Sequence, residues 1–434
     1  MQPTPERRRV DVVVAGHRDL FGTPRALEHA GLLRHLVTDL YVGKGSVLHP
    51  LEPLLRFGPR SVRKLLARDS GLPGRRIVAN NLAGLRSWRA LRGVSDPGAA
   101  SILHQRLARE LGESLLRRCP PFADAVVGYR MSDWLFARLP GSTAKLLCQN
   151  DGGAHEVGVV AKVWRENPEW RSPAEQRATP EEESREVPEW LHAERARLKE
   201  EWRLSTTIVC WSEWCVRCVT AEGVPREKCV VVPPTFSPSP AFRNCEPRYD
   251  RDPFTIVFLG TLCLRKGIHD LIQAVSMAAE SVPVRLILAG PNQTNPEKLR
   301  LPGGIVDYRG TVPHGELPAL FSDGHVLVLP SYSEGFAMVQ LEAMAAGLPV
   351  LRSTRTGESS RDGVEGYVFE PGDREALAAA IVKLARDRAL LREMGTRARR
   401  RVDDFNLEAC SGRWSDVVDG AAASLAADGG GRRA

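Results

Sequence analysis

The sequence predicts an α/β protein with two Rossmann-like domains, each built on a parallel sheet. Three observations support this prediction. The chain has 434 residues, more than one hydrophobic core usually holds. Short apolar runs and helical patterns alternate strictly from residue 254 to residue 388, as in a parallel sheet covered on both faces. The apolar run from Val10 to Gly16, followed by a loop and a helical pattern, opens the chain in the same way.

The first domain is expected to span residues 1–235. Its predicted strands cover residues 10–16, 124–128, 144–148, 207–212 and 230–234, and its predicted helices cover 25–33, 190–202 and 213–222. Residues 51–104 are predicted to form a basic helical insertion. Residues 165–190 are polar and contain four prolines, which predicts a mobile surface loop. The proline-rich segment 233–252 is the expected linker.

The second domain is expected to span residues 236–404. Its predicted strands cover residues 254–260, 284–290, 305–309, 326–330 and 349–352. Its predicted helices cover residues 268–280, 316–322, 337–346 and 374–388. Residues 405–434 are expected to form a C-terminal helix and a disordered tail.

The composition is typical of a globular protein, with 43% hydrophobic and 26% charged residues. The sequence lacks an apolar run close to the ~20 residues of a membrane-spanning helix, and its start lacks the apolar region of a secretory signal. Nine cysteines without paired spacing favour a reducing compartment. Cys210, Cys215 and Cys218 cluster without a fourth ligand nearby, which favours buried cysteines over a metal site. We therefore expect a cytoplasmic protein.

The positive charge is concentrated in residues 51–104. This block holds ten arginines and lysines against three acidic residues, a surplus that equals the net charge of +7 for the whole chain. Segments 51–56 and 62–68 have the pattern of short basic amphipathic helices, which can lie on an anionic membrane surface. Peripheral contact at the inner membrane face and a plain solvated surface both remain open. Nucleic-acid binding is not expected, because the block lacks interleaved aromatic residues.

The stretch from Ser331 to Glu342 carries the strongest functional signal. It lies between an apolar run and a helical pattern, so Glu334 and Glu342 flank a strand-to-helix turn. Free N–H groups at a helix start bind anions, and carboxylates accept hydrogen bonds from hydroxyls. Glu342 is expected roughly 10 Å beyond Glu334 along the helix axis, at 1.5 Å per residue. This order fits a nucleotide-sugar, in which a pyrophosphate lies between two hydroxyl-rich sugars.

Two other strand ends carry candidate residues. Arg265 and Lys266 precede Gly267 and a helical pattern, so two cations and free N–H groups are expected at one edge of the sheet. In the first domain, Asp151 and His155 follow the predicted strand 144–148, and open α/β sheets bind ligands at such ends. An Asn-Asp-Gly-Gly sequence is also typical of a plain turn, and this alternative stays open.

Several segments together resemble retaining family 4 glycosyltransferases of the GT-B fold. These segments are residues 258–267, 331–350 and 361–373 in the second domain, with 208–214 and 230–234 in the first. The resemblance is close over about residues 188–400 and looser before them. It implies two Rossmann-like domains whose parallel sheets face each other across a cleft.

The resemblance also implies roles for residues of the second domain. Glu342 would accept hydrogen bonds from the donor ribose, and Glu334 would contact hydroxyls of the transferred sugar. Arg265 and Lys266 would neutralise the pyrophosphate and stabilise the leaving nucleoside diphosphate. Many relatives have arginine where this chain has Thr261, so phosphate binding would rest on that pair. Further donor contacts are expected from Gly335, Phe336 and Ala337, mostly through the backbone, and from Arg309 to Val312 toward the nucleobase.

The acceptor side is expected in the first domain, at Gly22, Asp151 and His155. His155 is the best-placed histidine for a catalytic role beside Glu334, Arg265 and Lys266. The resemblance implies no covalent nucleophile, no metal and no cofactor, with a UDP- or GDP-linked sugar as co-substrate.

The function implied is transfer of a sugar, with retention of configuration, from a nucleotide-sugar to a glycan, lipid-linked or small-molecule acceptor. Two alternatives stay open. One is a sugar-nucleotide epimerase or hydrolase of the same fold. The other is a non-catalytic subunit of GT-B shape that binds a partner or a membrane.

Overall fold

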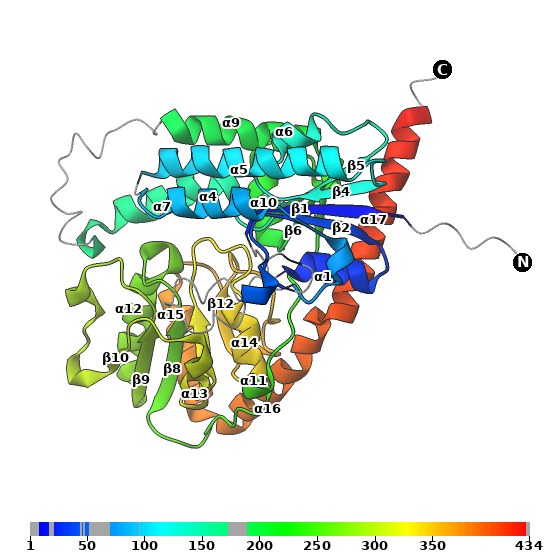
Figure 1. Cartoon of the computed structure of the whole chain (residues 1–434). Coiled ribbons are helices and arrows are strands. Elements are labelled where there is room, and N and C mark those ends of the chain that lie inside the picture. The colour runs from blue at the N-terminus through cyan, green and yellow to red at the C-terminus, as the bar shows by residue number, and fades with distance from the viewer. Residues whose placement is uncertain are drawn as a thin grey trace, which may run out of the picture.

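The computed structural model describes residues 8–16, 21–43, 46, 48–51, 70–94, 96–171 and 189–430. Its strands form two sheets, one above the other in Figure 1, in which all neighbouring strands are parallel. This arrangement confirms the predicted α/β class with two Rossmann-like domains. None of the helices in the described part of the chain combines the length and the apolar character needed to cross a membrane.

The first sheet is built from short, buried, β-branched runs such as Val10–Val14. From edge to edge it consists of β3 (Ile77–Ala79), β2 (Leu33–Thr38), β1 (Val10–Val14), β4 (Ala125–Gly128), β5 (Ala144–Gln149), β6 (Thr207–Cys210) and β7 (Cys229–Val231). Its helices are α1 (Gly22–His29), α4 (Asn81–Leu91), α5 (Pro97–Arg118), α6 (Asp133–Phe136), α7 (Gly153–Glu166), α9 (Glu189–Leu204) and α10 (Glu213–Ala221).

The second sheet holds the larger core. From edge to edge it consists of β10 (Val306–Tyr308), β9 (Val284–Ala289), β8 (Phe254–Leu259), β11 (Val326–Leu329), β12 (Val350–Ser353) and β13 (Gly366–Phe369). Its helices are α12 (Ile268–Ala279), α13 (Leu317–Ser322), α14 (Val339–Ala345), α15 (Arg374–Arg386) and α16 (Arg388–Arg401), and the linker contains α11 (Pro240–Arg243). Strands predicted near 254, 284, 305, 326 and 349 are thereby confirmed.

Some predicted elements were wrong in extent. The helix predicted over 25–33 ends at His29, because Gly31 adopts a left-handed conformation with φ of 72°, and β2 begins at Leu33. The helix predicted from residue 337 begins only at Val339, because Ala337 has φ of 42°. Strands β2, β3 and β13 were not predicted. β3 and β13 have only three and four residues, and the first residue of the six-residue β2, Leu33, was assigned to the preceding helix.

The segment predicted as a mobile loop, residues 165–190, starts as ordered structure. Helix α7 continues to Glu166, and the 3₁₀ turn η5 (Pro168–Trp170) follows. Trp170 is only 3% exposed and belongs to the hydrophobic core of the second domain. Burial of the apolar Trp170 side chain explains why the first part of this polar segment is ordered rather than a surface loop. Residues 172–188 lie outside the described residues, as do most of the basic segments predicted as helices at 51–56 and 62–68.

The C-terminal helix crosses back to the first domain. Helix α17 (Leu407–Gly430), the red ribbon in Figure 1, extends from the second domain along the edge of the first. Its residues Trp414, Val417 and Val418 are buried in the same core cluster as Val10 and Phe21. The first domain is therefore completed by a segment that follows the second domain in sequence.

Candidate functional site

The Ser331–Glu342 stretch forms a tight turn between β11 and α14. Phe336 is buried and its ring lies 5.6 Å from the ring of Phe405, which fixes the middle of the turn to the core. The amide of Gln340 donates to the backbone oxygens of Phe336 and Gly357, both at 3.3 Å. Because α14 begins late, Glu342 lies in its first turn rather than deeper in the helix as predicted. The backbone of Gly335 and Ala337 is thus left in a rigid, non-helical turn.

Arg265, Lys266 and Glu334 form one cluster at the carboxyl edge of the second sheet. The 3₁₀ turn η8 (Leu264–Lys266) presents both cations directly before α12. Arg265 Nη1 donates to Glu334 Oε2 at 3.1 Å and to the backbone oxygen of Ser333 at 2.7 Å. Lys266 Nζ donates to the same carboxylate oxygen. The structure therefore brings together three of the predicted donor-site residues.

The opposite charges in this cluster shift the pKa values of Glu334 and Arg265. Burial favours the neutral form of Glu334, but the charges of Lys266 and Arg265 outweigh it and lower the pKa of this carboxyl. Burial disfavours the charged form of Arg265, yet the Glu334 and Glu156 carboxylates raise the pKa of the guanidinium. Glu334 and Arg265 thus stabilise each other in their charged forms. Arg265 and Lys266 are the two cations that an anionic ligand would meet here, and the Glu156 carboxylate also lies 4.0 Å from Arg265.

Glu342 faces a residue that the sequence analysis did not single out. Its Oε1 lies 3.7 Å from Nδ1 of His314, in the 3₁₀ turn η11 (His314–Glu316) after β10. Burial raises the pKa of Glu342, with the His314 charge acting against the rise. Arg309 and Val312 lie in the same connection between β10 and α13, where Arg309 Nε donates to Asp307 at 3.1 Å. The side chain of Arg309 is thus engaged with a neighbouring carboxylate.

The donor-side turn touches the first domain directly. A Cβ atom added to Gly335 would lie 1.9 Å from the backbone oxygen of Asn150, so only glycine fits at this distance. Asn150 follows β5 and Gly335 follows β11, so the carboxyl edges of the two sheets meet here. Trp214 Nε1 donates to Ser333 Oγ at 2.9 Å, and Ser333 Oγ donates to Glu156 Oε2 at 2.7 Å. A chain of hydrogen bonds therefore links the domains beside Glu334.

The three predicted acceptor-side residues have different surroundings. Asp151 accepts hydrogen bonds from Gln149 Nε2 and from the backbone N–H of Gly153, both at 2.9 Å. His155 lies on α7 with its ring 6.1 Å from the Trp214 ring in an edge-to-face arrangement. Gly22 begins α1, and a Cβ on it would lie 3.1 Å from Cβ of Thr235. Asp151 and His155 thus lie near the donor turn, whereas Gly22 packs against the linker. Their catalytic roles stay predictions.

Sequence analysis missed four residues that the structure places at the site: Glu156, Ser333, Trp214 and His314. Glu156 directly follows His155, so its helix was identified but this carboxylate was not singled out. Ser333 lies inside the motif. Trp214 ends the segment 208–214 that resembles the family, and His314 carried no local signal. The contacts of both residues join distant segments, which the sequence does not show.

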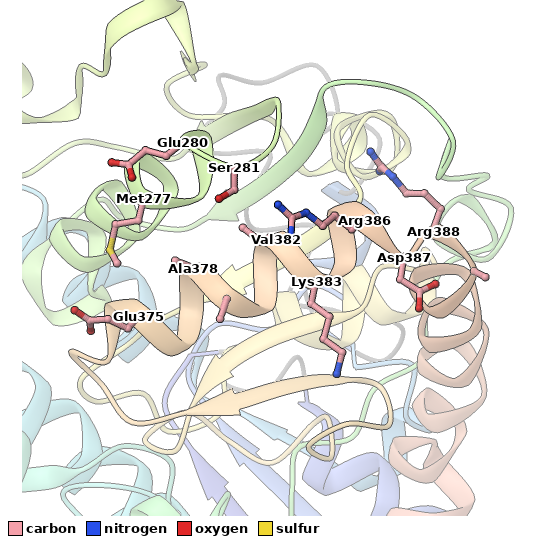
Figure 2. Close-up of a pocket in the computed structure, with 12 residues that line it drawn as sticks. Met277, Glu280, Ser281, Glu375, Ala378, Val382, Lys383, Arg386, Asp387 and Arg388 are labelled. Carbon is pink, nitrogen blue, oxygen red and sulfur yellow. The ribbon is translucent and has the colours of Figure 1, made fainter.

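A hollow of about 1050 Å³ on the second domain does not belong to this site. It lies between the end of α12 and α15, and Figure 2 shows Met277, Glu280 and Ser281 facing Val382 and Arg386. Among the residues that the structure describes, no three His, Cys, Asp or Glu side chains are grouped to hold a metal ion. The nine cysteines, including Cys210, Cys215 and Cys218, are buried.

Residues 253–387 match the family described as glycosyl transferases group 1. The chain is 32% identical over 164 residues to O-antigen chain mannosyltransferase B of Escherichia coli, which is 36% of this chain and 43% of that protein. It is 31% identical over 188 residues to D-inositol 3-phosphate glycosyltransferase of Streptomyces avermitilis, covering 39% of this chain and 40% of that protein. The matched segment thus spans less than half the length of these relatives.

Solved structures match the chain over most of its length. Sucrose-phosphate synthase of Thermosynechococcus elongatus has a TM-score of 0.57 at 19% identity, covering 95% of this chain and 98% of that chain. The Anabaena protein HepE, in a crystal structure with UDP-glucose, has a TM-score of 0.56 at 15% identity, covering 95% of this chain and 100% of that chain. These similarities confirm the GT-B fold.

Proposed function

We propose that the protein is a retaining glycosyltransferase that uses a nucleotide-sugar donor. The observation that carries this proposal is the Arg265, Lys266 and Glu334 cluster at the carboxyl edge of the second sheet. It lies inside the segment that matches the glycosyl transferases group 1 family. The names of the relatives, a mannosyltransferase among them, and the UDP-glucose bound to HepE support the same donor class.

Each residue of the cluster has a role in this proposal. Arg265 and Lys266 bind the diphosphate and stabilise the charge that develops on it as the sugar leaves. Glu334, released from the two cations by the diphosphate, accepts hydrogen bonds from the sugar hydroxyls. Glu342 accepts hydrogen bonds from the ribose, while the backbone of Gly335 and Ala337 lines the turn. In this proposal the two cations meet the diphosphate charge, so the chemistry demands no metal ion and no other cofactor.

Replacing Glu342 with alanine is expected to weaken UDP or GDP binding by about 10- to 100-fold. A hydrogen bond to a charged group contributes about 1.5–3 kcal/mol, and about 1.4 kcal/mol is tenfold in affinity. Isothermal titration measures the loss, with the exposed neighbour Glu316→Ala as the matched control. Burial raises the pKa of Glu342, so this carboxylate becomes protonated at a higher pH than an ordinary glutamate, whose pKa is about 4.3. As the pH is lowered, the nucleotide affinity of the wild type should therefore begin to fall while the pH is still above that value. Unchanged affinity in Glu342→Ala would remove this residue from the site.

The acceptor side is proposed to lie in the first domain, with Gly22, Asp151 and His155, and to extend from the donor turn beside Asp151 to the carboxyl ends of β1 and β2. A hollow of about 540 Å³ opens there between α4 and α5, lined by Gly16, Asp39, Trp88, Arg92 and His104. Its mixed apolar and charged lining fits a glycan, a lipid-linked sugar or a polar small molecule.

We further propose that the described part of the basic block touches an anionic membrane through α4. Leu82, Leu85, Arg86 and Arg89 follow helical spacing on its exposed side, and the Leu82 side chain is 75% exposed. Apolar and cationic groups on one face suit the surface of a membrane with negative lipids.

Liposome flotation tests this contact with phosphatidylglycerol-containing vesicles. Wild-type protein is expected to float with them at low salt and to be released near 1 M salt, where the Debye length is about 3 Å. Leu82→Asp should reduce flotation several-fold, whereas Met277→Asp, at a residue 37% exposed on the second domain, should not. Equal flotation of both variants, or flotation insensitive to salt, would assign the block to an ordinary solvated surface.

A further inference from the structure

Glu156 brings a second carboxylate to the cationic cluster, from the other domain. Its Oε2 accepts the hydrogen bond from Ser333 Oγ at 2.7 Å. Its Oε1 lies 4.0 Å from Arg265 Nη1, beyond hydrogen-bond distance. The same Arg265 nitrogen lies 3.1 Å from Glu334 Oε2. Arg265 therefore has one carboxylate of each domain beside it, and one oxygen of Glu156 keeps capacity to accept a hydrogen bond.

The helix that carries Glu156 is fixed to the second domain at its far end. Val163 on α7 and Trp170 in η5 are buried in the core of the second domain. The backbone oxygen of Trp170 accepts from the N–H of Asn295 at 2.9 Å, and its ring lies 6.0 Å from that of His269. Figure 1 shows α7 beside the second domain, above α12. Glu156 is thus held against the donor turn by the fold, although it belongs to the first half of the sequence.

A hydroxyl group of a sugar acceptor suits this carboxylate. A carboxylate is an acceptor only, and it repels a diphosphate, so Glu156 does not serve the anionic part of a donor. Glu334 already faces the donor from its own domain. Glu156 reaches the site from the first domain, next to the cation that would hold the leaving phosphate. A hydroxyl bound to Glu156 would therefore lie on the leaving-group side of the sugar.

Resting on the proposed function, we propose that Glu156 Oε1 accepts a hydrogen bond from the attacking hydroxyl of the acceptor and holds it beside the leaving phosphate. In the transfer, the acceptor oxygen forms a bond to the anomeric carbon and the bond from that carbon to the diphosphate oxygen breaks. As that bond breaks, the hydroxyl proton leaves its hydrogen bond with Glu156 Oε1 and passes to the diphosphate oxygen that has just parted from the anomeric carbon. Entry of the hydroxyl on this side accounts for retention of configuration, and Glu156 itself forms no covalent bond.

The surroundings of Glu156 give this role a pH signature. Burial raises the pKa of its carboxyl, and the hydrogen bond from Ser333 and the charge of Arg265 only partly offset the rise. Asp151 and Glu334 also face it and raise the pKa further, and the Cys218 thiol lies nearby. The carboxylate accepts best when ionised, so turnover should fall as the pH drops through this raised pKa.

The test uses the full chain with water as the acceptor probe. Hydrolysis of UDP-glucose and GDP-mannose is followed with wild type, Glu156→Gln and Glu156→Ala, and UDP and GDP binding is titrated in parallel. We expect Glu156→Ala to bind the nucleotide within about twofold of wild type and to lose turnover on the order of 10²-fold. Formate, but not chloride, should restore part of that turnover, and the acid limb of the pH profile should shift in Glu156→Gln. The control Glu166→Gln, at the exposed end of the same helix, should match wild type.

The outcomes separate this proposal from the proposed function. An active wild type with an equally active Glu156→Ala would overturn the role of Glu156 alone. The role of Glu156 would also be overturned if Glu156→Ala lost nucleotide affinity and turnover to the same extent. The same holds if Glu156→Ala kept wild-type thermal stability but formate did not restore its turnover. Both results indicate a structural role for Glu156. A wild type that neither binds nor hydrolyses these nucleotides would overturn the proposed function and this proposal with it.

Discussion

Arg265→Ala is expected to reduce UDP or GDP affinity by at least about 100-fold and to remove detectable turnover. Arg265 holds Ser333 through its backbone oxygen and Glu334 through its carboxylate, and it is the cation nearest to Glu156. Its loss removes charge-assisted hydrogen bonds to the diphosphate, each contributing about 1.5–3 kcal/mol. It also leaves two partly buried carboxylates with only Lys266 to balance them, which disfavours an anionic ligand. Isothermal titration and donor hydrolysis measure the two effects.

The control for this variant is Arg392→Ala. Arg392 lies on α16 of the same domain and donates to the two carboxylate oxygens of Asp250 at 2.8 and 2.7 Å, away from the donor turn. Its replacement removes one arginine and one ion pair without touching the site, so nucleotide affinity should stay within about twofold of wild type. Equal loss in both variants would show that net charge, rather than the position of Arg265, governs binding.

Gly335→Ala is expected to lower turnover by about 10²-fold or more. The added Cβ would lie 1.9 Å from the backbone oxygen and 2.7 Å from the backbone carbon of Asn150, so the two domains must move apart at this point. The hydrogen bonds from Trp214 to Ser333 and from Ser333 to Glu156 would lengthen with that movement. A displacement of about 1 Å among reacting groups can cost 10²-fold in rate.

Gly158→Ala is the matched control, since a Cβ there meets nothing within 4 Å and the residue lies on α7. It should keep wild-type turnover and gain a little stability, because alanine favours a helix by up to about 1 kcal/mol over glycine. Nucleotide binding by Gly335→Ala should weaken less than turnover, because Arg265 and Lys266 belong to one domain. Wild-type hydrolysis by Gly335→Ala would show that the close approach of the domains is not needed for transfer.

Much of the fold was predictable because its signal is local. The second-domain strands are apolar runs such as Val326–Leu329, and the alternation with helices fixed the parallel arrangement. The exceptions have physical causes. Strand β3 is only three residues long, and Ala337 adopts a left-handed conformation that no composition rule assigns to alanine. The side on which α17 packs depends on its apolar face matching that of α1, which is a contact between the two ends of the chain.

The site was predictable only where its residues share one domain. Arg265, Lys266 and Glu334 come together because neighbouring parallel strands end at the same edge of the sheet. Glu156 and Trp214 reach that edge from the first domain. The periodicity of a sequence predicts helices and strands but not contacts between side chains of two domains. His155 was favoured for its chemistry, yet its ring packs on Trp214 while the adjacent Glu156 faces the cationic cluster.

The path of the chain decides how this protein can be divided for biophysical work. A cut at residue 235 would deprive the first domain of Trp414, Val417 and Val418, and would expose Trp170 from the first half to water. Each half would then carry an uncovered apolar face and tend to aggregate. A separately purified first half therefore needs α17 joined to it. The place where α17 passes the first strand is marked by a hydrogen bond of 2.9 Å from Arg8 Nε to Asp419 Oδ1. A second half needs residues 153–170 supplied as a peptide.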